Sequence, residues 1–284
     1  MNHNEITVYE PNQRLKIGFF QTWMVMVKNI LRSRELVFQL FKRDFFLPYK
    51  KSFLGIGWIL LSPLIGIASW VFLNATGVLE PGETPIPFPA YILISTSIWG
   101  LFMGFYGAAA GTLGAGNGFI MQVKYPHEAL LLKQTAQHLA SFLITFALNI
   151  ALLFIFGIPL SWGLLLFPII IIPMFLLGAG LGLMISVISV VATDITNFVN
   201  LGLSVLFYAT PIIYSSKDKD PLLQTLNNLN PLTYLVGGVR DFIITGNMDH
   251  WDRFLILAVL SLVFFLLAWR LFYVSEDKVI EKMI

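Results

Sequence analysis

Six long hydrophobic runs, separated by polar or proline-containing segments, dominate the pattern along the chain. Each run is long enough to cross roughly 30 Å of hydrocarbon as a helix, although the fifth is the shortest. The runs span residues 53–73, 89–110, 138–157, 162–191, 197–214 and 253–273. The fourth contains Pro168 and Pro173, so we expect it to be tilted or kinked. The pattern predicts an all-α membrane protein with six transmembrane helices.

A helical alternation of polar and apolar positions precedes the first run, over residues 33–47. One arc of that helix is apolar: Leu36, Val37, Leu40, Phe41, Phe45 and Leu47. The opposite arc is polar: Glu35, Gln39, Lys42 and Arg43. Asp44 is the exception, since it falls inside the apolar arc. The pattern predicts an N-terminal amphipathic interface helix lying in the membrane plane, with residues 17–31 as a second, more interrupted one. A charged flank that only fixes orientation is the alternative.

The basic residues predict which side of the membrane each end occupies. Of the 18 Lys and Arg, nine precede Phe53, two lie between the second and third runs, and three lie in the C-terminal part from Arg270 onward. Fourteen therefore fall on one face, against four on the other. By the positive-inside rule both termini are cytoplasmic.

Two loops are longer than is needed to connect one predicted span to the next. Residues 111–137 form the cytoplasmic one, in which Pro126 starts a helix with Glu128 in its first turn. Residues 215–252 form the outer one, whose apolar positions predict two short re-entrant periplasmic helices before the last span. The expected organisation is an N-terminal cytoplasmic segment (1–52), a transmembrane domain (53–273) and a cytoplasmic tail (274–284).

Composition supports a membrane protein and removes several kinds of chemistry. The chain is 57% hydrophobic and 12% charged, far from the roughly 25% charged residues of soluble domains. It has no Cys and no His pair at metal-ligand spacing. The glycine-rich stretch 111–118 lacks the Lys-Ser/Thr of a phosphate loop, and Gly178, Gly180 and Gly182 favour helix packing. We expect no metal, no cofactor bound by this chain, and no nucleic-acid partner.

Aromatic residues within the spans are the candidate substrate contacts. Rings with one polar atom suit the faces and hydroxyls of sugars, although lipid-facing rings and interface belts are the ordinary alternative. The candidates are Trp58, Tyr91, Trp99, Phe102, Tyr106, Phe207 and Tyr208. Charges are nearly absent from the spans, which disfavours an ion-coupled transporter.

Several short motifs, in order, resemble the type-2 ATP-binding-cassette permeases of polysaccharide export. They are Leu40-Phe41-Lys42-Arg43-Asp44 with residues 49–55, then Tyr125-Pro126-His127-Glu128, Thr193-Asp194-Ile195, residues 209–214, Asn230-Pro231-Leu232-Thr233, and Arg240-Asp241. His127 and Thr193 stand where the family more often has arginine.

This resemblance implies a division of labour between subunits. The chain would form a homodimer in the bacterial inner membrane, joined by two cytoplasmic P-loop ATPase subunits that bind ATP and Mg. The substrate would be a lipid-linked polysaccharide such as O-antigen, with teichoic acid, capsule, or a small lipid or drug as alternatives. Coupling to the ATPase would involve Lys42, Arg43, Asp44, Phe119, Gln122, Lys124, Tyr125, His127 and Glu128. The outer re-entrant segment would include Asn230, Pro231, Arg240 and Asp241.

A function of another class remains an alternative at this point. A membrane-embedded glycosyl- or acyltransferase would require clustered acids, His or Arg at one membrane edge, and none is visible in the sequence.

Overall fold

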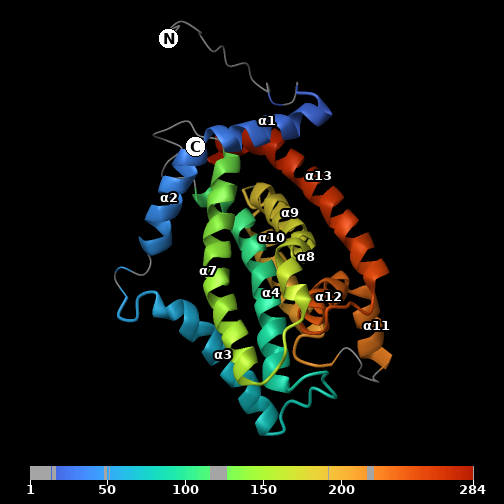
Figure 1. Ribbon diagram of the computed structural model, residues 1–284. Helices are drawn as coiled ribbons and strands as arrows, with labels where there is room; N and C mark the ends of the chain where they lie inside the picture. Colours follow the sequence, from blue (N-terminus) through green and yellow to red (C-terminus); the bar gives the residue numbers. More distant parts are fainter. Residues whose placement is uncertain are drawn as a thin grey trace, which may run out of the picture.

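The computed structural model describes residues 14, 17–47, 50, 52–115, 127–190, 192–215 and 221–283, and all its regular structure there is helical (Figure 1). The elements are α1 (Phe19–Arg32), α2 (Arg34–Phe46), α3 (Gly57–Ala75), α4 (Phe88–Ala110), α5 (Thr112–Ala115), α7 (His127–Ile155), the 3₁₀ helix η3 (Trp162–Leu166), α8 (Phe167–Ile170), α9 (Ile172–Ile188), α10 (Thr193–Ala209), α11 (Pro221–Leu229), α12 (Pro231–Thr245) and α13 (Trp251–Met283).

Helices α4 and α9 form the centre of the molecule, with α7 and α13 packed beside them. Three glycines make this packing close. A Cβ at Gly182 would lie 2.3 Å from the carbonyl oxygen of Tyr106, and one at Gly178 would lie 2.9 Å from that of Phe102. The remaining glycine, Gly180, faces Phe264 of α13. The prediction that this glycine run is a helix-packing face is confirmed.

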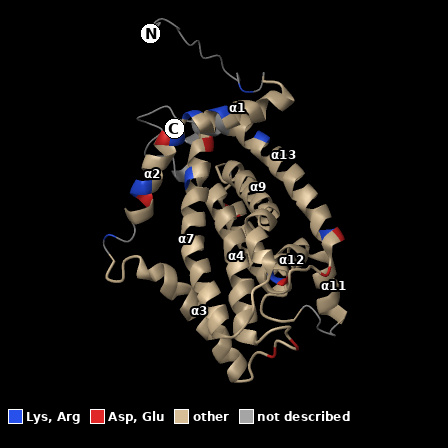
Figure 2. Cartoon of the chain, in the orientation of Figure 1, with Lys and Arg blue, Asp and Glu red and all other residues tan. Residues whose placement is uncertain are grey.

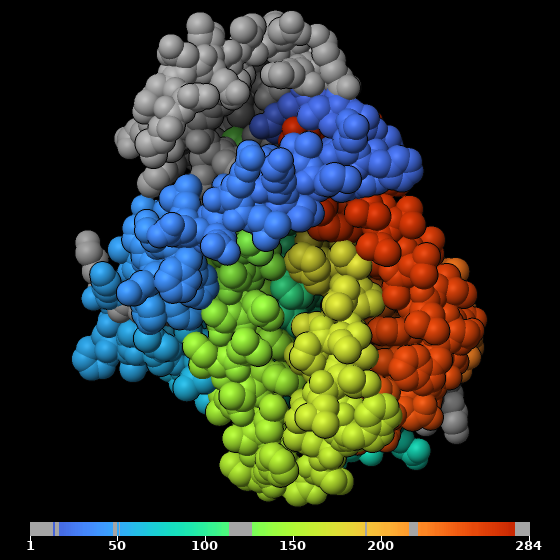
Figure 3. Space-filling model, turned by 45° about the horizontal axis from the view of Figure 1, so that its top comes forward, coloured from blue at the N-terminus to red at the C-terminus, as the bar shows by residue number. Residues whose placement is uncertain are grey.

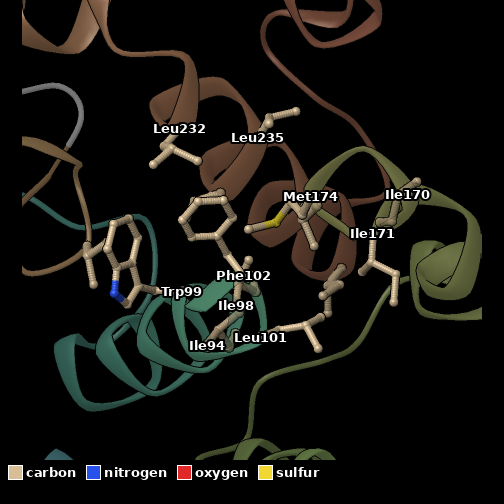
Figure 4. Close-up of a cluster of buried hydrophobic side chains, with 14 of the residues drawn as sticks. Ile94, Ile98, Trp99, Leu101, Phe102, Ile170, Ile171, Met174, Leu232 and Leu235 are labelled. Atoms are coloured by element: carbon tan, nitrogen blue, oxygen red, sulfur yellow. The ribbon is translucent and has the colours of Figure 1, made fainter. Parts of the chain in front are cut away.

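A continuous apolar core connects α4, α8, α9 and α12 (Figure 4). Its side chains include Ile98 and Phe102 of α4, Met174 of α9, and Leu235 of α12. These four are between 0% and 1% exposed. The outer helix α12 is therefore anchored on the central helices and packs as part of the bundle.

The predicted fourth span is interrupted as expected from its prolines. The run is divided into η3, α8 and α9, and the two α-helices each have proline within their first two positions, Pro168 and Pro173. Proline is tolerated there because those amides have no partner inside the helix.

Five helices of the described residues are long and apolar enough to cross a membrane: Gly57–Ala75, Phe88–Ala110, His127–Ile155, Trp162–Ile188 and Trp251–Ser275. The third begins earlier than the predicted residue 138, and the last continues as helix beyond the predicted boundary at residue 273. The predicted fifth span, 197–214, is α10, a helix of only 17 residues. At 1.5 Å per residue that is roughly 26 Å, slightly less than the hydrocarbon thickness.

Helices α1 and α2 lie across one end of the bundle, over α7 and α13 (Figure 3). The Trp23 indole N–H of α1 donates to the carbonyl oxygen of Leu266 at 3.1 Å, and the Arg270 guanidinium lies 4.0 Å from the centre of the Phe19 ring. The N-terminal helix thus touches the last helix near its C-terminal half. Helix α1 and this part of α13 lie at the same end of the bundle. The chain between them therefore runs along the bundle an even number of times.

Charged residues gather mainly at the two ends of the bundle, most densely around α1 and α2 (Figure 2). The helical segments between them are almost entirely uncharged. This distribution matches a slab of hydrocarbon around the middle of the molecule.

Candidate coupling surface and transport path

Helix α2 is fixed to the first turns of α7 by a small apolar cluster. Val37 and Leu40 of α2 pack on Ala129 and Leu130 of α7, and all four are buried. The opposite arc of α2 remains exposed, as its helical pattern predicts. Lys42 and Arg43 lie on that exposed side.

Asp44 is the one polar residue inside the apolar arc of α2, and its two cationic partners account for its position there. Its carboxylate accepts hydrogen bonds from the Lys133 Nζ at 2.9 Å and from the Arg43 Nε at 2.5 Å. Burial alone would raise the pKa of Asp44, but these two cations outweigh it and hold that pKa below its ordinary value. The hydrogen bond from Arg43 correspondingly raises the pKa of the guanidinium. Asp44 therefore ties α2 to the buried ammonium of α7.

The remaining predicted coupling residues separate into two groups. His127 and Glu128 form the first turn of α7, as expected, and are 2% and 0% exposed. The Asn29 amide of α1 donates to Glu128 Oε1 at 3.5 Å. These two side chains are therefore buried, unlike those of Lys42 and Arg43. Phe119, Gln122, Lys124 and Tyr125 lie outside the described residues.

The predicted aromatic candidates also separate by position. Tyr91 and Phe102 are 0% exposed and Tyr106 is 4% exposed, so these three side chains pack inside the subunit. Tyr106 Oη donates to Asn200 Oδ1 at 2.9 Å and links α4 to α10. Trp58, at the start of α3, is 44% exposed and lies apart from the others.

Three candidates do meet, in an open aromatic recess of about 280 Å³ between α4 and α10. It is lined by Trp99, Met103, Leu203, Ser204, Phe207 and Tyr208. The Trp99 and Phe207 ring centroids are 5.6 Å apart, and those of Phe207 and Tyr208 are 5.3 Å apart. Outside this lining, the ring centroid of Trp70 in α3 lies 6.0 Å from that of Phe207.

The helices beside this aromatic recess are barely covered by the rest of the chain. No residue of α3 is buried, and Leu203 is the buried residue of α10. Figure 1 shows α3 angled away from the bundle. Apolar side chains such as Ile65 and Leu201, 53% and 64% exposed, thus face outward on both helices.

At the other end of the molecule, a buried arginine joins three elements. Arg240 of α12 donates through Nη1 to Tyr91 Oη at 2.7 Å, to Ser95 Oγ at 3.3 Å and to the Pro211 carbonyl at 3.0 Å. Its Nε pairs with Asp241 at 3.0 Å. The arginine is 2% exposed, so it fastens α12 to α4 and to the end of α10.

Asn230 and Pro231 begin α12 by ordinary helix-capping chemistry. The Asn230 Oδ1 accepts from the Leu232 amide at 3.0 Å, and Pro231 occupies the first turn. The Asn230 amide nitrogen also donates to Thr210 Oγ1 at 2.8 Å. All four residues predicted for the re-entrant segment therefore belong to the packing of α12, and its depth in the membrane stays a prediction.

These features describe a multi-pass membrane transport subunit: an apolar helical bundle, an exposed basic helix at one end and an aromatic recess along its side. Among the described residues, no group of His, Asp and Glu is arranged to hold a metal ion. A sequence profile of the ABC-2 type transporter family matches residues 35–244, which is most of the bundle. The chain belongs to this family. It is therefore a transporter subunit and not an enzyme, and membership implies pairing with an ATP-binding-cassette ATPase subunit.

Three relatives are each named O-antigen export system permease protein RfbA. The protein from Myxococcus xanthus is 23% identical over 260 residues, covering 91% of this chain and 99% of the relative. Two proteins from Klebsiella pneumoniae are 24% and 26% identical, and each comparison covers 76% of this chain and 83% of the relative. Similarity therefore extends over 76% to 91% of the chain, at low identity.

Proposed function

We propose that this chain is the permease subunit of an ATP-driven exporter that moves a lipid-linked polysaccharide, of the O-antigen kind, across the bacterial inner membrane. The observation that carries the proposal is the aromatic recess of Trp99, Phe207 and Tyr208, which opens on a side of the bundle left uncovered. Aromatic rings stack on sugar faces without the charged pocket that a small ionic substrate needs. The relatives named as O-antigen permeases support the same substrate class.

The uncovered faces of α3 and α10 support a homodimer. Exposed apolar helix faces next to the recess would be buried by a second copy, which would place the two recesses on either side of one path. Since the chain has no Cys, the variant Ile65→Cys/Leu201→Cys allows a clean crosslinking test. We expect a covalent dimer in membranes, and a Leu143→Cys/Phe154→Cys control on exposed positions of α7 should remain monomeric.

Energy would enter from two copies of a cytoplasmic P-loop ATPase, which hold ATP and Mg, through the exposed arc of α2. In this topology α10 is the fifth of six crossings, and both termini are cytoplasmic. The even number of passes required by the contact between α1 and α13 supports this arrangement.

The function is tested by reconstituting the chain with a candidate P-loop ATPase in vesicles. We expect glycolipid transport only when both subunits and ATP are present. Tyr208→Ala should slow transport while leaving the thermal unfolding temperature unchanged, whereas Phe154→Ala, equally exposed on α7, should transport normally. Transport that follows a proton gradient without ATP would overturn the proposal.

A further inference from the structure

A second cavity, separate from the aromatic recess, lies between α11, α12 and the segment leading into α13. Its volume is about 210 Å³, far above the space that a single water needs. It is lined by Pro211, Asn227, Asn228, Thr233, Tyr234, Gly237, Gly238, Arg240, Asp241, Met248, Asp249 and His250. We call it the polar recess. It lies in the half of the molecule opposite α1 (Figure 1).

Two buried polar atoms, each on a residue that lines the polar recess, lack a hydrogen-bond partner among the described residues. The Asn227 side chain is 6% exposed, and its Oδ1 accepts from Tyr214 Oη at 2.9 Å while its Nδ2 is buried without a hydrogen bond. Thr233 Oγ1 is likewise buried and without a partner. Buried polar groups are normally satisfied, so a donor and a hydroxyl left open at one cavity point to a ligand there.

The charges around the polar recess favour a neutral ligand. Arg240 is already paired with Asp241 and donates to Tyr91, Ser95 and Pro211. Asp249 adds a negative charge at the wall, and Arg253, whose guanidinium donates to the Tyr234 hydroxyl, adds a positive one. With these charges balanced, an ion of either sign meets no net opposite charge here, whereas a hydroxyl group can donate to the carboxylates and accept from the Asn227 amide.

The polar recess also offers apolar surface beside these polar groups. Met248 is 3% exposed, and the Tyr234 ring stands edge to face with His250, with centroids 5.6 Å apart. A wall that mixes apolar surface with a few convergent polar atoms suits a sugar ring, which has C–H faces and hydroxyl edges.

We propose that the polar recess binds one neutral, hydroxyl-rich sugar residue of the transported polymer at the end opposite α1. This inference rests on the proposed function for its substrate class. In the proposed topology the bound sugar would belong to the emerging part of the chain.

Gly237 provides a variant that fills the polar recess without disturbing the fold. It is buried, yet the nearest atom to a Cβ placed there is Arg240 Nη2 at 3.7 Å, an ordinary contact. Gly237→Ala therefore adds a methyl group to the free space. Thr233→Val removes the unpartnered hydroxyl at nearly constant shape. Gly107→Ala is the matched control, because nothing lies within 4 Å of its Cβ and it is remote from the recess in α4.

The test uses the complete transporter with its ATPase in nanodiscs. Saturation-transfer NMR is recorded with D-glucose, D-galactose, D-mannose and N-acetyl-D-glucosamine, and with inorganic phosphate as the anionic comparison. We expect at least one sugar to bind the unmodified chain and the Gly107→Ala control equally. Thr233→Val should weaken that binding by about tenfold, as for the loss of one hydrogen bond. Gly237→Ala should also weaken it, because its methyl group takes up space in the recess. Binding of phosphate but no sugar, or equal sugar binding in all variants, would overturn the inference.

Transport measured in parallel separates this inference from the proposed function. If ATP-driven glycolipid export runs normally while no sugar occupies the polar recess, the inference alone fails. If no glycolipid is exported by the unmodified transporter, the proposed function itself fails, and the sugar assignment fails with it.

Discussion

The Arg240 guanidinium lies 4.3 Å from the centre of the Tyr91 ring and donates to the hydroxyl of the same residue at 2.7 Å. The Tyr91 hydroxyl in turn donates to the carbonyl oxygens of Pro211 and Tyr214, at 3.0 and 2.9 Å. One tyrosine of α4 thus connects the arginine of α12 with the end of α10. From the sequence, Tyr91 is a candidate for substrate contact because it is aromatic. In the structure its ring and hydroxyl instead hold α4, α12 and the end of α10 together.

Tyr91→Phe should destabilise the protein while keeping the ring in place. The arginine loses one acceptor and the Tyr214 carbonyl loses the hydroxyl as a donor, whereas the Pro211 carbonyl keeps its hydrogen bond from Arg240. The cost in this buried site is about 1–3 kcal/mol. We expect a lower thermal unfolding temperature in detergent. Tyr208→Phe, whose tyrosine is 59% exposed, is the control and should unfold like the unmodified chain. Equal unfolding temperatures for the two variants would contradict the role given to Tyr91.

Asp44→Asn should loosen α2 from α7. The substitution leaves the Lys133 ammonium, only 9% exposed, without its carboxylate. Faster amide hydrogen exchange in α2 than in the unmodified chain is the expected result. The charge swap Asp44→Lys/Lys133→Asp should restore part of the protection, and if it does not, the ion pair is not what holds α2.

The same ion pair predicts a dependence on pH. Because the folded protein holds the pKa of Asp44 below its model-peptide value of 3.8, the stabilisation is complete above that value. It is lost as the pH falls through the still lower pKa of the folded state. Protection of α2 should therefore be constant near neutral pH and decrease below about pH 4. The Asp44→Asn variant should show no such decrease.

Reversing the charges of Lys42 and Arg43 should uncouple the two subunits. Both lie on the exposed arc of α2, but Arg43 also donates to Asp44, so Lys42→Glu is tested alone beside Lys42→Glu/Arg43→Glu. The single variant changes the surface offered to the ATPase and leaves the Asp44–Lys133 ion pair in place. We expect ATP hydrolysis to continue while glycolipid transport falls strongly in both variants, with an unchanged thermal unfolding temperature for Lys42→Glu. Lys28→Glu/Arg32→Glu on α1 is the matched control. Full transport by both α2 variants would remove this surface from the coupling pathway.

Gly182→Ala should separate α4 from α9. The new methyl carbon would lie 2.3 Å from the Tyr106 carbonyl oxygen and 2.6 Å from the Ala109 Cβ, so the two backbones must move apart. Overpacking of this kind costs about 1–3 kcal/mol. The thermal unfolding temperature should fall, and Gly107→Ala, the same change at an open position of α4, should leave it unaltered or slightly higher.

Most of the fold can be predicted from the helical periodicity and the prolines of the sequence. The amphipathic pattern of residues 33–47 predicts α2, and Pro168 and Pro173 predict the interruption between η3 and α9. The end of α10 follows from Pro211, because the residue before a proline is pushed out of the helical region and Thr210 is extended, although the hydrophobic run continues to Tyr214. Asp44 falls on the apolar arc of α2, and a charged residue at such a position indicates a partner from another helix, which the structure shows to be Lys133.

The sites are harder to predict than the helices. Aromatic composition selects Tyr91 and Tyr208 equally, although one is buried and the other exposed, since burial depends on the neighbouring helices. The polar recess has no signature in the sequence, because Asn227, Thr233 and Asp249 come together only through the turns between α11, α12 and α13.

The last helix, α13, contains neither proline nor glycine over its 33 residues. At 1.5 Å per residue it is a rod of roughly 50 Å, with no point at which it bends easily. It starts beside the polar recess at Trp251 and passes under α1 near Leu266. A tilt imposed at one end must therefore displace the other, so that events on the two faces of the membrane are mechanically linked within a single subunit.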